Sequence, residues 1–282
     1  MSPAAKSKLD ERRLCLHQVT VLQQWSTQQF IDGMQRHGIG AVALWRDKLR
    51  EVGAAEVARM LKGTGLAVTS LCAAGLITTP DPQETVAAID ELKRAIDDTA
   101  AVGAGSLMFV AGGIDPRDKN LESTRKRVLD RLAGLTHYAR AAGIKIALEP
   151  LHPMTCGLRS VLNSTKTAND WCDVLRADDV FGIAIDTYAV WWDHDLEREL
   201  MRAGKRIINF HVDDWLSDTQ DLRLDRGMMG DGLIDIPGIR SMVEAAGYDS
   251  YVEVEIFSQR NWWKRDADEV IRIVKERFQT AV

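Results

Sequence analysis

The chain has 282 residues, of which 45% are hydrophobic and 27% are charged. This mixture is typical of a globular protein with a substantial core, which excludes a disordered chain. The 36 basic and 41 acidic residues give a net charge of −5, and no run of Lys or Arg offers a footprint for phosphate backbones, so we expect no nucleic-acid partner.

Short apolar runs rich in β-branched residues recur along the chain after residues 1–12, which we expect to be a flexible N-terminal segment. Eight such runs are predicted to be strands, at 14–19, 41–44, 67–71, 106–110, 145–148, 182–185, 207–210 and 251–254. Amphipathic segments with helical spacing lie between them, among them 83–102, 121–142 and 236–246. Many of these segments end in glycine, as helices commonly do, and the next strand follows directly.

Eight βα repeats without a break in composition predict one α/β domain, a (β/α)8 TIM barrel over residues 1–282. A doubly wound open sheet is the alternative architecture. It would place a glycine-rich phosphate loop after the first strand, yet residues 17–26 contain no glycine. The missing loop favours the closed barrel.

The cysteines and the hydrophobic runs bear on the location of the protein. The four cysteines, at positions 15, 72, 156 and 172, are scattered and form no CxxC pair, so we expect reduced thiols in a cytoplasmic protein. No apolar segment follows the first charged residues, and nowhere do about 18 apolar residues run together. We therefore expect neither export nor a membrane span.

Four of the predicted strands end in polar side chains that can bind metals. Glu149 ends the fifth strand, Asp186 the sixth and His211 the seventh, while Glu255 ends the eighth. In a (β/α)8 barrel these ends converge on the mouth, where active sites lie. Each residue alone would be a strand-end cap or a salt-bridge partner, but together they predict a site for one divalent cation. The donor set suits Mn2+ best, with Mg2+, Co2+ and Zn2+ as alternatives.

A cation also follows from the crowding of carboxylates, because without one they would repel each other and at least one would take up a proton. A bound cation could polarise a hydroxyl and a carbonyl of a small sugar-like substrate, stabilising an enediolate as it forms. Glu253 shares a strand face with Glu255, so the alternation of side chains leaves the choice of ligand open. Glu255 lies nearer the strand end.

The order and spacing of several motifs resemble the xylose isomerase-like TIM-barrel superfamily of sugar phosphate isomerases and epimerases, and especially its inosose isomerase branch. The motifs are IALEP at 146–150, VLNSTKTANDWCDVL at 161–175, IDTY at 185–188, FHVDD at 210–214, DRGMMGDGLIDIPGI at 225–239 and VEVEIFS at 252–258. The resemblance covers nearly the whole chain, and it implies that Glu149, Asp186, His211 and Glu255 bind the metal. It further implies that Glu149 and Glu255 are catalytic and shuttle a proton across the substrate. A dimer or tetramer is also implied.

Five other residues are candidates for substrate binding. His152 follows the fifth strand, with a plain surface-loop histidine as the alternative. Arg226 matches the position where similar enzymes have an arginine over the substrate, and a salt bridge to a neighbour is the alternative. Trp45 and Trp191 could form an apolar wall for a sugar ring, and His17 could face the pocket, although core packing would explain each of these three as well.

Ala189 departs from the resemblance. In related epimerases and in inosose isomerase, the residue three positions after the metal-binding aspartate is typically histidine and touches the substrate. A methyl group cannot donate a hydrogen bond, so a polar substrate group at this place must find another partner or water. The departure points to a different substrate or to a weakened activity.

The leading hypothesis is a metal-dependent isomerase or epimerase acting on a ketose, a keto-inositol or a related polyol. The alternative is a lyase or hydratase that eliminates from a 3-keto sugar or 3-keto glycoside, which begins with the same proton removal. A DNA-repair endonuclease would need more than the six histidines present and a basic surface. A non-catalytic sugar-binding protein would not require a complete set of metal ligands.

Overall fold

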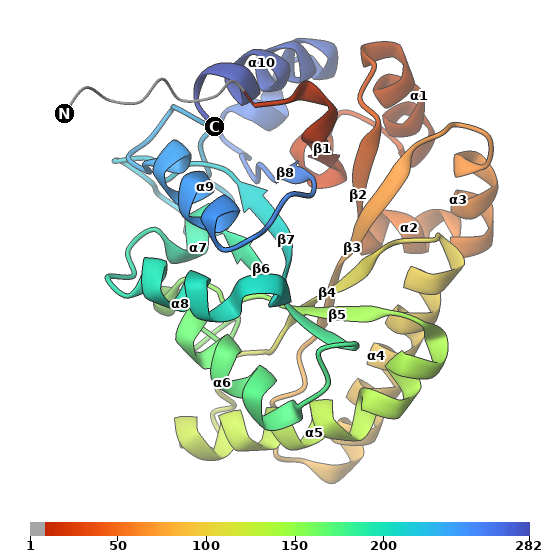
Figure 1. Ribbon diagram of the computed structural model, residues 1–282. Coiled ribbons are helices and arrows are strands. Elements are labelled where there is room, and N and C mark those ends of the chain that lie inside the picture. The colour runs from red at the N-terminus through yellow and green to blue at the C-terminus, as the bar shows by residue number, and fades with distance from the viewer. Residues whose placement is uncertain (1–8) are drawn as a thin grey trace.

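The computed structural model describes residues 9–282 and shows eight parallel strands closed into one barrel (Figure 1). The strands are β1 (Leu14–His17), β2 (Ala41–Trp45), β3 (Ala67–Gly75), β4 (Ser106–Val110), β5 (Lys145–Leu148), β6 (Phe181–Asp186), β7 (Ile207–Val212) and β8 (Val252–Val254). Each strand pairs with the next, and β8 pairs with β1 to close the ring. The predicted TIM barrel is confirmed, and each strand overlaps a predicted apolar run.

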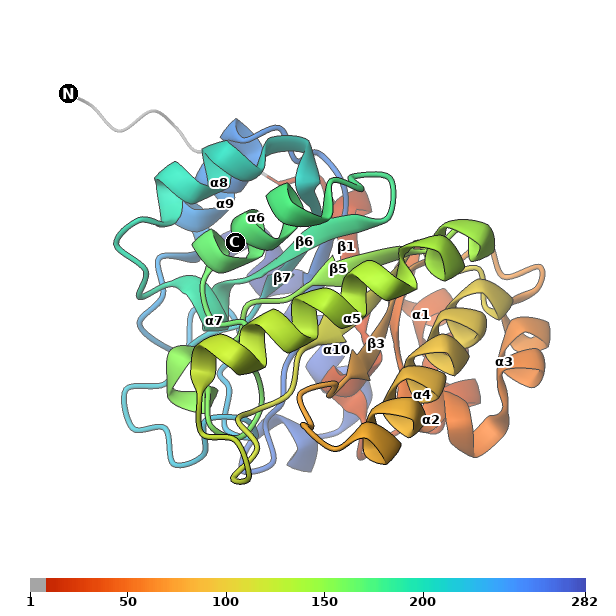
Figure 2. The ribbon, with the colours of Figure 1, turned by 90° about the horizontal axis from the view of Figure 1, so that it is seen from below.

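Helices surround the barrel, and the longest of them, α4 and α5, lie side by side (Figure 2). The α-helices are α1 (Thr27–His37), α2 (Arg46–Val52), α3 (Ala54–Leu61), α4 (Pro82–Ala101), α5 (Leu121–Ala142), α6 (Thr165–Leu175), α7 (Thr187–Val190), α8 (Leu196–Ala203), α9 (Ile236–Ala245) and α10 (Ala267–Thr280). Short 3-10 helices are η1 (Glu11–Arg13), η2 (Gln18–Val21), η3 (Pro153–Thr155), η4 (Gly204–Arg206) and η5 (Trp262–Lys264). Of the expected flexible segment 1–12, residues 1–8 lie outside the described residues, whereas Leu9 is buried in the core.

Local sequence signals determine where the elements begin and end. The side chain of Asn120 accepts a hydrogen bond from the backbone N–H of Ser123 and caps the start of α5. Gly143 ends that helix in the left-handed conformation, with φ of 70°, which glycine adopts without a steric penalty. The chain then turns directly into β5, and Glu149 follows the last residue of that strand.

The side chains of the strands divide between two interiors. Large residues such as Leu107, Ile146 and Phe210 belong to the main core between the sheet and the helices. The inside of the barrel contains small residues such as Ala147 and Ala184 together with buried polar groups. Because side chains alternate along a strand, a bulky outer face leaves space inside for polar side chains near the barrel axis.

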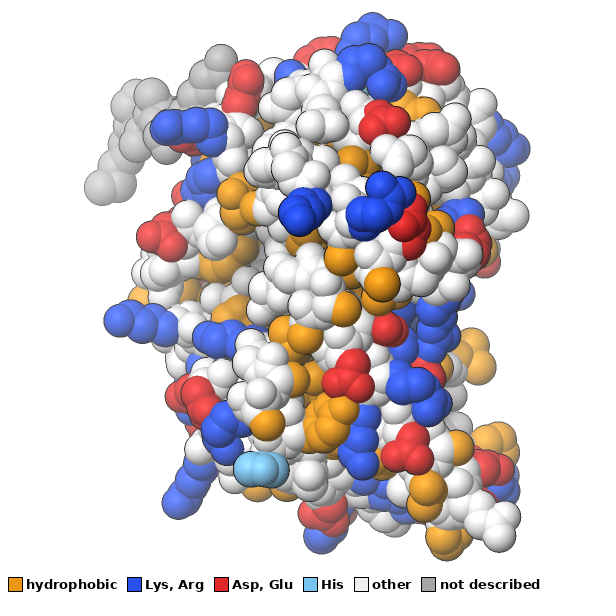
Figure 3. All heavy atoms as spheres, turned by 90° about the vertical axis from the view of Figure 1, so that its right-hand side faces the viewer, with side chains coloured by type: hydrophobic (Ala, Val, Ile, Leu, Met, Phe, Trp, Pro, Cys, Tyr) orange, Lys and Arg blue, Asp and Glu red, His pale blue; other side chains and the backbone are white. Residues whose placement is uncertain are grey.

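The surface carries both signs of charge. On the face that Figure 3 shows, basic and acidic side chains are interspersed, with small apolar areas between them. Elsewhere on the surface, Arg202 of α8 forms ion pairs with Asp170 and Asp173 of α6 at 2.8 and 2.6 Å. Among residues 9–282, no helix combines the length and the apolar character needed to cross a bilayer.

Candidate active site

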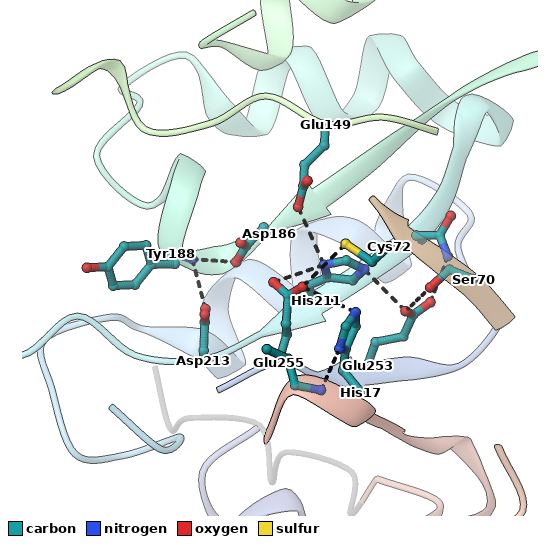
Figure 4. A network of polar contacts seen from close by, with 12 residues as sticks. His17, Ser70, Cys72, Glu149, Asp186, Tyr188, His211, Asp213, Glu253 and Glu255 are labelled. Atoms are coloured by element: carbon teal, nitrogen blue, oxygen red, sulfur yellow. Dashed lines mark hydrogen bonds and ion pairs between the residues drawn. The ribbon is translucent and has the colours of Figure 1, made fainter. Parts of the chain in front are cut away.

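The carboxyl ends of β5 to β8 bring together the four residues that the strand ends predicted, Glu149, Asp186, His211 and Glu255. All four are buried, and each offers one oxygen or nitrogen atom within 4.8 Å of those of the others. The Nδ1 atom of His211 lies 3.6 Å from Glu149 Oε1 and 3.7 Å from Glu255 Oε2 (Figure 4). Both glutamates therefore converge on the same ring nitrogen of His211.

Glu253 lies on the opposite side of the same imidazole ring. Its Oε2 atom is 3.2 Å from His211 Nε2, and the carboxylate also accepts hydrogen bonds from Ser70 at 2.8 Å and Asn209 at 2.7 Å (Figure 4). A carboxylate at Nε2 favours the tautomer with the proton there, which leaves the lone pair of Nδ1 facing the group of four. The geometry thus separates the two glutamates that the sequence left as alternatives: Glu255 offers a ligand atom, and Glu253 orients His211.

Arg226 brings a positive charge into this group from the loop between β7 and α9. Its Nη1 atom lies 3.0 Å from Asp186 Oδ2 and 3.1 Å from Glu255 Oε2, and it also donates to Asp213. The guanidinium is buried and lies over the ring of Tyr188, 4.6 Å from its centroid. Arg226 therefore neutralises part of the charge of the clustered carboxylates.

Burial and mutual repulsion control the protonation of the site. Burial raises the pKa of Glu149, and the charges of neighbouring carboxylates raise it further. Burial alone would also raise the pKa of Glu255, but the surrounding imidazole and guanidinium groups lower it overall. For His211 burial acts to lower the pKa, yet the three nearby glutamates raise it well above its usual value. Protons therefore compensate charge here, and a cation could replace them.

The donor set fits a divalent cation. Three carboxylates and one neutral imidazole nitrogen are the ligands that hard and borderline cations take in proteins. Both ring nitrogens of His211 are buried and lack a hydrogen bond of good geometry within residues 9–282. Nδ1, whose lone pair faces the other three residues, is therefore suited to bind a metal ion.

A second group of metal-binding side chains shares Glu255 and consists of His17, Cys72 and Glu255. The Nδ1 atom of His17 accepts a hydrogen bond from the backbone N–H of Val19 at 3.1 Å, which places the ring proton on Nε2, 3.4 Å from Glu255. Burial lowers the pKa of His17 to about 4, so the ring is neutral at neutral pH. With its proton on Nε2, His17 supports Glu255 rather than binding metal, and it does not line the cavity as the sequence suggested.

A cavity opens above the carboxylates. Its lining includes Trp45, His152, Tyr188, Ala189 and Arg226, with Glu149, Asp186 and Glu255 at its base. Three of the five predicted substrate-binding residues, Trp45, His152 and Arg226, therefore face this space. Ala189 also faces it, so the missing histidine leaves a methyl group on the wall.

Trp191 is the exception among the aromatic residues. It lines a separate cavity on the outside, and its ring lies 5.7 Å from that of Trp215. Trp215 in turn packs against Tyr188 at 4.6 Å and His152 at 4.7 Å. The structure thus places the Trp191 ring against Trp215 and not in the lining of the active-site cavity, and a role in substrate binding stays a prediction.

Two polar residues of the site, Asp213 and Asn209, were not predicted, although their spacing from His211 indicates their orientation. Asp213 lies two positions after His211 and Asn209 two positions before it, so strand alternation directs all three to the same side. Asp213 contacts Arg226, and Asn209 contacts Glu253. Two loop arginines that line the cavity, Arg159 and Arg223, have no comparable signal, because a loop side chain is oriented by tertiary contacts.

Comparisons with known proteins agree with this architecture. The chain is 24% identical over 282 residues to inosose isomerase of Bacillus velezensis (strain DSM 23117 / BGSC 10A6 / LMG 26770 / FZB42), covering 96% of this chain and 97% of the relative. Its sequence is 43% identical to that of protein SMc04130 from Sinorhizobium meliloti 1021, whose crystal structure matches with a TM-score of 0.93. The match covers 96% of this chain and 99% of that protein.

Two further structures share the fold. One is the IolI protein with a bound zinc atom, 22% identical, with a TM-score of 0.79 and coverage of 93% and 95%. The other is D-allulose 3-epimerase from Methylomonas sp., 21% identical, with a TM-score of 0.77 and coverage of 99% and 100%. The family described as "Xylose isomerase-like TIM barrel" matches residues 31–277. The chain therefore belongs to the xylose isomerase-like TIM-barrel family, and the resemblance read from its motifs is confirmed.

Proposed function

We propose that the chain is a divalent-metal-dependent isomerase or epimerase that moves a proton at the carbon beside a carbonyl of a ketose, a keto-inositol or a related polyol. The observation that carries this proposal is the convergence of Glu149 and Glu255 on the same atom, His211 Nδ1, with both carboxylates lining the cavity (Figure 4). Inosose isomerase and D-allulose 3-epimerase, to which the chain is similar, support the same class of reaction.

Glu149, Asp186, His211 and Glu255 would hold the ion, which when bound polarises the carbonyl and the adjacent hydroxyl of the substrate. One of the two glutamates would accept the proton from the carbon beside the carbonyl. Donation of a proton by the other glutamate to the opposite face of the same carbon gives an epimer. Return of the proton to the adjacent carbon, with the hydroxyl proton moving to the former carbonyl oxygen, gives an isomer. Both outcomes conserve the mass of the substrate, and neither needs a further reactant.

The walls of the cavity would orient the sugar. The Nδ1 atom of His152 accepts a hydrogen bond from the backbone N–H of Met154 at 3.3 Å, which leaves Nε2 as a donor for a hydroxyl group. The ring of Trp45 offers an apolar surface to the C–H face of a sugar. Because Ala189 offers no hydrogen bond, we propose that the substrate carries an apolar edge there or keeps a water molecule.

Mn2+ is the proposed metal, with Zn2+ as the main comparator because the IolI structure holds zinc. A reducing, cytoplasmic location is proposed from the four cysteines, all of which are free in the structure. Metal content after purification, followed by removal and reloading with Mn2+, Mg2+, Co2+ or Zn2+, identifies the ion that supports activity.

The direct test is hydrogen exchange in D2O with metal-loaded protein and a panel of ketoses and inososes. We expect deuterium at the carbon beside the carbonyl, loss of exchange in Glu149→Gln, and normal exchange in the matched surface variant Glu122→Gln. A product lighter by a leaving group would show elimination instead. No exchange with any compound, from protein with a full complement of metal, would overturn the proposal.

A further inference from the structure

Two guanidinium groups at the rim of the active-site cavity lack an acidic partner. Arg159 and Arg223 line both this cavity and a second one beside it, so they stand where the two spaces meet. Neither guanidinium makes a hydrogen bond or an ion pair within residues 9–282. The other arginines of the two cavities are paired: Arg226 with Asp186, Arg46 with Asp98 and Arg50 with Glu91.

The backbone holds both arginines in place. The loop after β5 carries Arg159, whose carbonyl accepts a hydrogen bond from the backbone N–H of Gly112 at 3.1 Å. The loop after β7 carries Arg223, whose backbone N–H donates to the carboxylate of Asp221 at 2.8 Å. The carboxylate of Asp221 thus accepts hydrogen bonds from backbone N–H groups. The side chains of Arg159 and Arg223 extend from fixed loops toward the same space.

The charges of this region favour an anion. Burial lowers the pKa of Arg159, and the nearby charge of Arg223 lowers it further, whereas the charge of Glu149 acts in the opposite direction. The second cavity is lined by four arginines and two carboxylates, namely Arg46, Arg50, Arg159, Arg223, Asp47 and Glu91. An excess of positive charge is notable in a chain whose net charge is −5. An oxyanion between Arg159 and Arg223 would relieve the repulsion and satisfy both donors.

We propose that Arg159 and Arg223 form a subsite for an oxyanion, a phosphate monoester or a carboxylate, carried by the substrate. This assignment rests on the proposed function, because it describes the far end of the molecule whose carbonyl end reacts above Glu149. Guanidinium groups bind the oxygens of either anion through paired, charge-assisted hydrogen bonds. Arg226 differs from these two residues, because its Nη1 atom donates to Asp186, Asp213 and Glu255, whose charges compensate its own.

The first experiment compares neutral and anionic ketoses in the D2O exchange assay, using D-fructose, D-fructose 6-phosphate and D-fructuronate. We expect KM to be at least about tenfold lower for one anionic compound than for D-fructose, and the preferred compound identifies phosphate or carboxylate as the group. Arg159→Gln and Arg223→Gln should each raise that KM by about 10- to 100-fold. The KM for D-fructose should stay within about threefold, since it makes no such contact.

Arg272→Gln is the matched control. Arg272 is an exposed residue of α10 that lines neither cavity, and it also lacks an acidic partner within residues 9–282. Its replacement removes one positive charge from the protein and should leave KM unchanged for all three compounds. An equal rise of KM in the control would show a general effect of net charge and would overturn the subsite.

A binding measurement separates this inference from the proposed function. Inorganic phosphate is titrated calorimetrically into metal-loaded protein at constant ionic strength. We expect binding by the wild type and Arg272→Gln, and at least about tenfold weaker binding by the double variant Arg159→Gln/Arg223→Gln. Equal phosphate binding by all proteins overturns the subsite. If phosphate binding depends on the two arginines but no compound takes up deuterium, the proposed function is overturned and the subsite stands. If deuterium exchange occurs with the same KM in the wild type and in both arginine variants, the subsite is overturned and the proposed function stands.

Discussion

Replacing Glu253 with glutamine tests whether the carboxylate beneath His211 sets the affinity of the site for its metal. Glu253 is fully buried, accepts hydrogen bonds from Ser70 and Asn209, and lies 3.2 Å from His211 Nε2. Glutamine has nearly the same shape, but it has one acceptor oxygen and brings an NH2 group toward these three donors. The imidazole therefore loses its negatively charged partner, and at least one buried donor loses its acceptor.

Two effects of this change weaken metal binding. Removal of the group that orients a ligating histidine typically lowers metal affinity by about 10- to 100-fold. The distance of 3.2 Å, the width of the imidazole ring and a metal–nitrogen bond put the lost charge about 7 Å from the ion, where its attraction to a divalent cation is about 5 kcal/mol at an effective dielectric constant of 20. The proton that His211 holds in the metal-free site loses the same partner, so only part of this energy changes the Kd. We expect the Kd for Mn2+ to rise by about 10- to 100-fold.

Calorimetric titration of metal-free protein with Mn2+ measures this Kd. Glu199→Gln is the matched control, because Glu199 is a buried glutamate of α8 that contacts Arg202 and Asn169 and lies outside the group of four. Both variants should unfold at a lower temperature than the wild type, but only Glu253→Gln should change the Kd. A Kd of Glu253→Gln within about twofold of the wild-type value would refute the orienting role.

Three further predictions concern stability. Arg226→Gln should destabilise the metal-free protein by about 3–5 kcal/mol, because the buried carboxylates lose their counter-charge, and Mn2+ should restore part of the loss; equal losses with EDTA and with Mn2+ in urea unfolding would contradict this. Asp214→Asn should cost about 2 kcal/mol in the same assay, because the carboxylate accepts three backbone N–H groups within residues 230–234; an unchanged midpoint would count against it. Mn2+ at about 100 times its Kd should stabilise the wild type by about 2.7 kcal/mol, or about 5 °C in Tm; identical melting curves with and without EDTA would disprove metal binding to the folded state.

The barrel and the position of its polar strand ends could be predicted from the sequence because both depend on local patterns. Apolar runs and glycine-terminated helices repeat eight times, and closure follows from their number. The carboxyl ends of parallel strands share one end of the barrel, so Glu149, Asp186, His211 and Glu255 had to lie near one another. Strand alternation directs both Glu253 and Glu255 inward, so the choice of Glu255 rested on the resemblance, and the contact of Glu253 with His211 Nε2 needed the structure.

The remaining contacts depend on tertiary structure. Trp191 follows the last residue of the short helix α7, and its ring lies against Trp215, which belongs to a separate segment. Arg159 and Arg223 lie 64 residues apart on separate loops, so their meeting reflects how both loops pack against the barrel. For His17, the backbone N–H of Val19 determines the tautomer, and this local contact is not visible in a pattern of residue types.

All four candidate ligands come from β5 to β8, so the two halves of the barrel differ in how much change they can tolerate. The half that contains β1 to β4 contributes the wall at Trp45 and the outer rim at Arg46 and Arg50, but no member of the group of four. A chimaera joined in the loop at residues 111–120 would inherit the complete set of ligands together with a foreign wall. Exchange of half-barrels between relatives thus offers a route to new substrates that keeps the four ligands, provided that the incoming half retains His17 and Ser70, which contact Glu255 and Glu253.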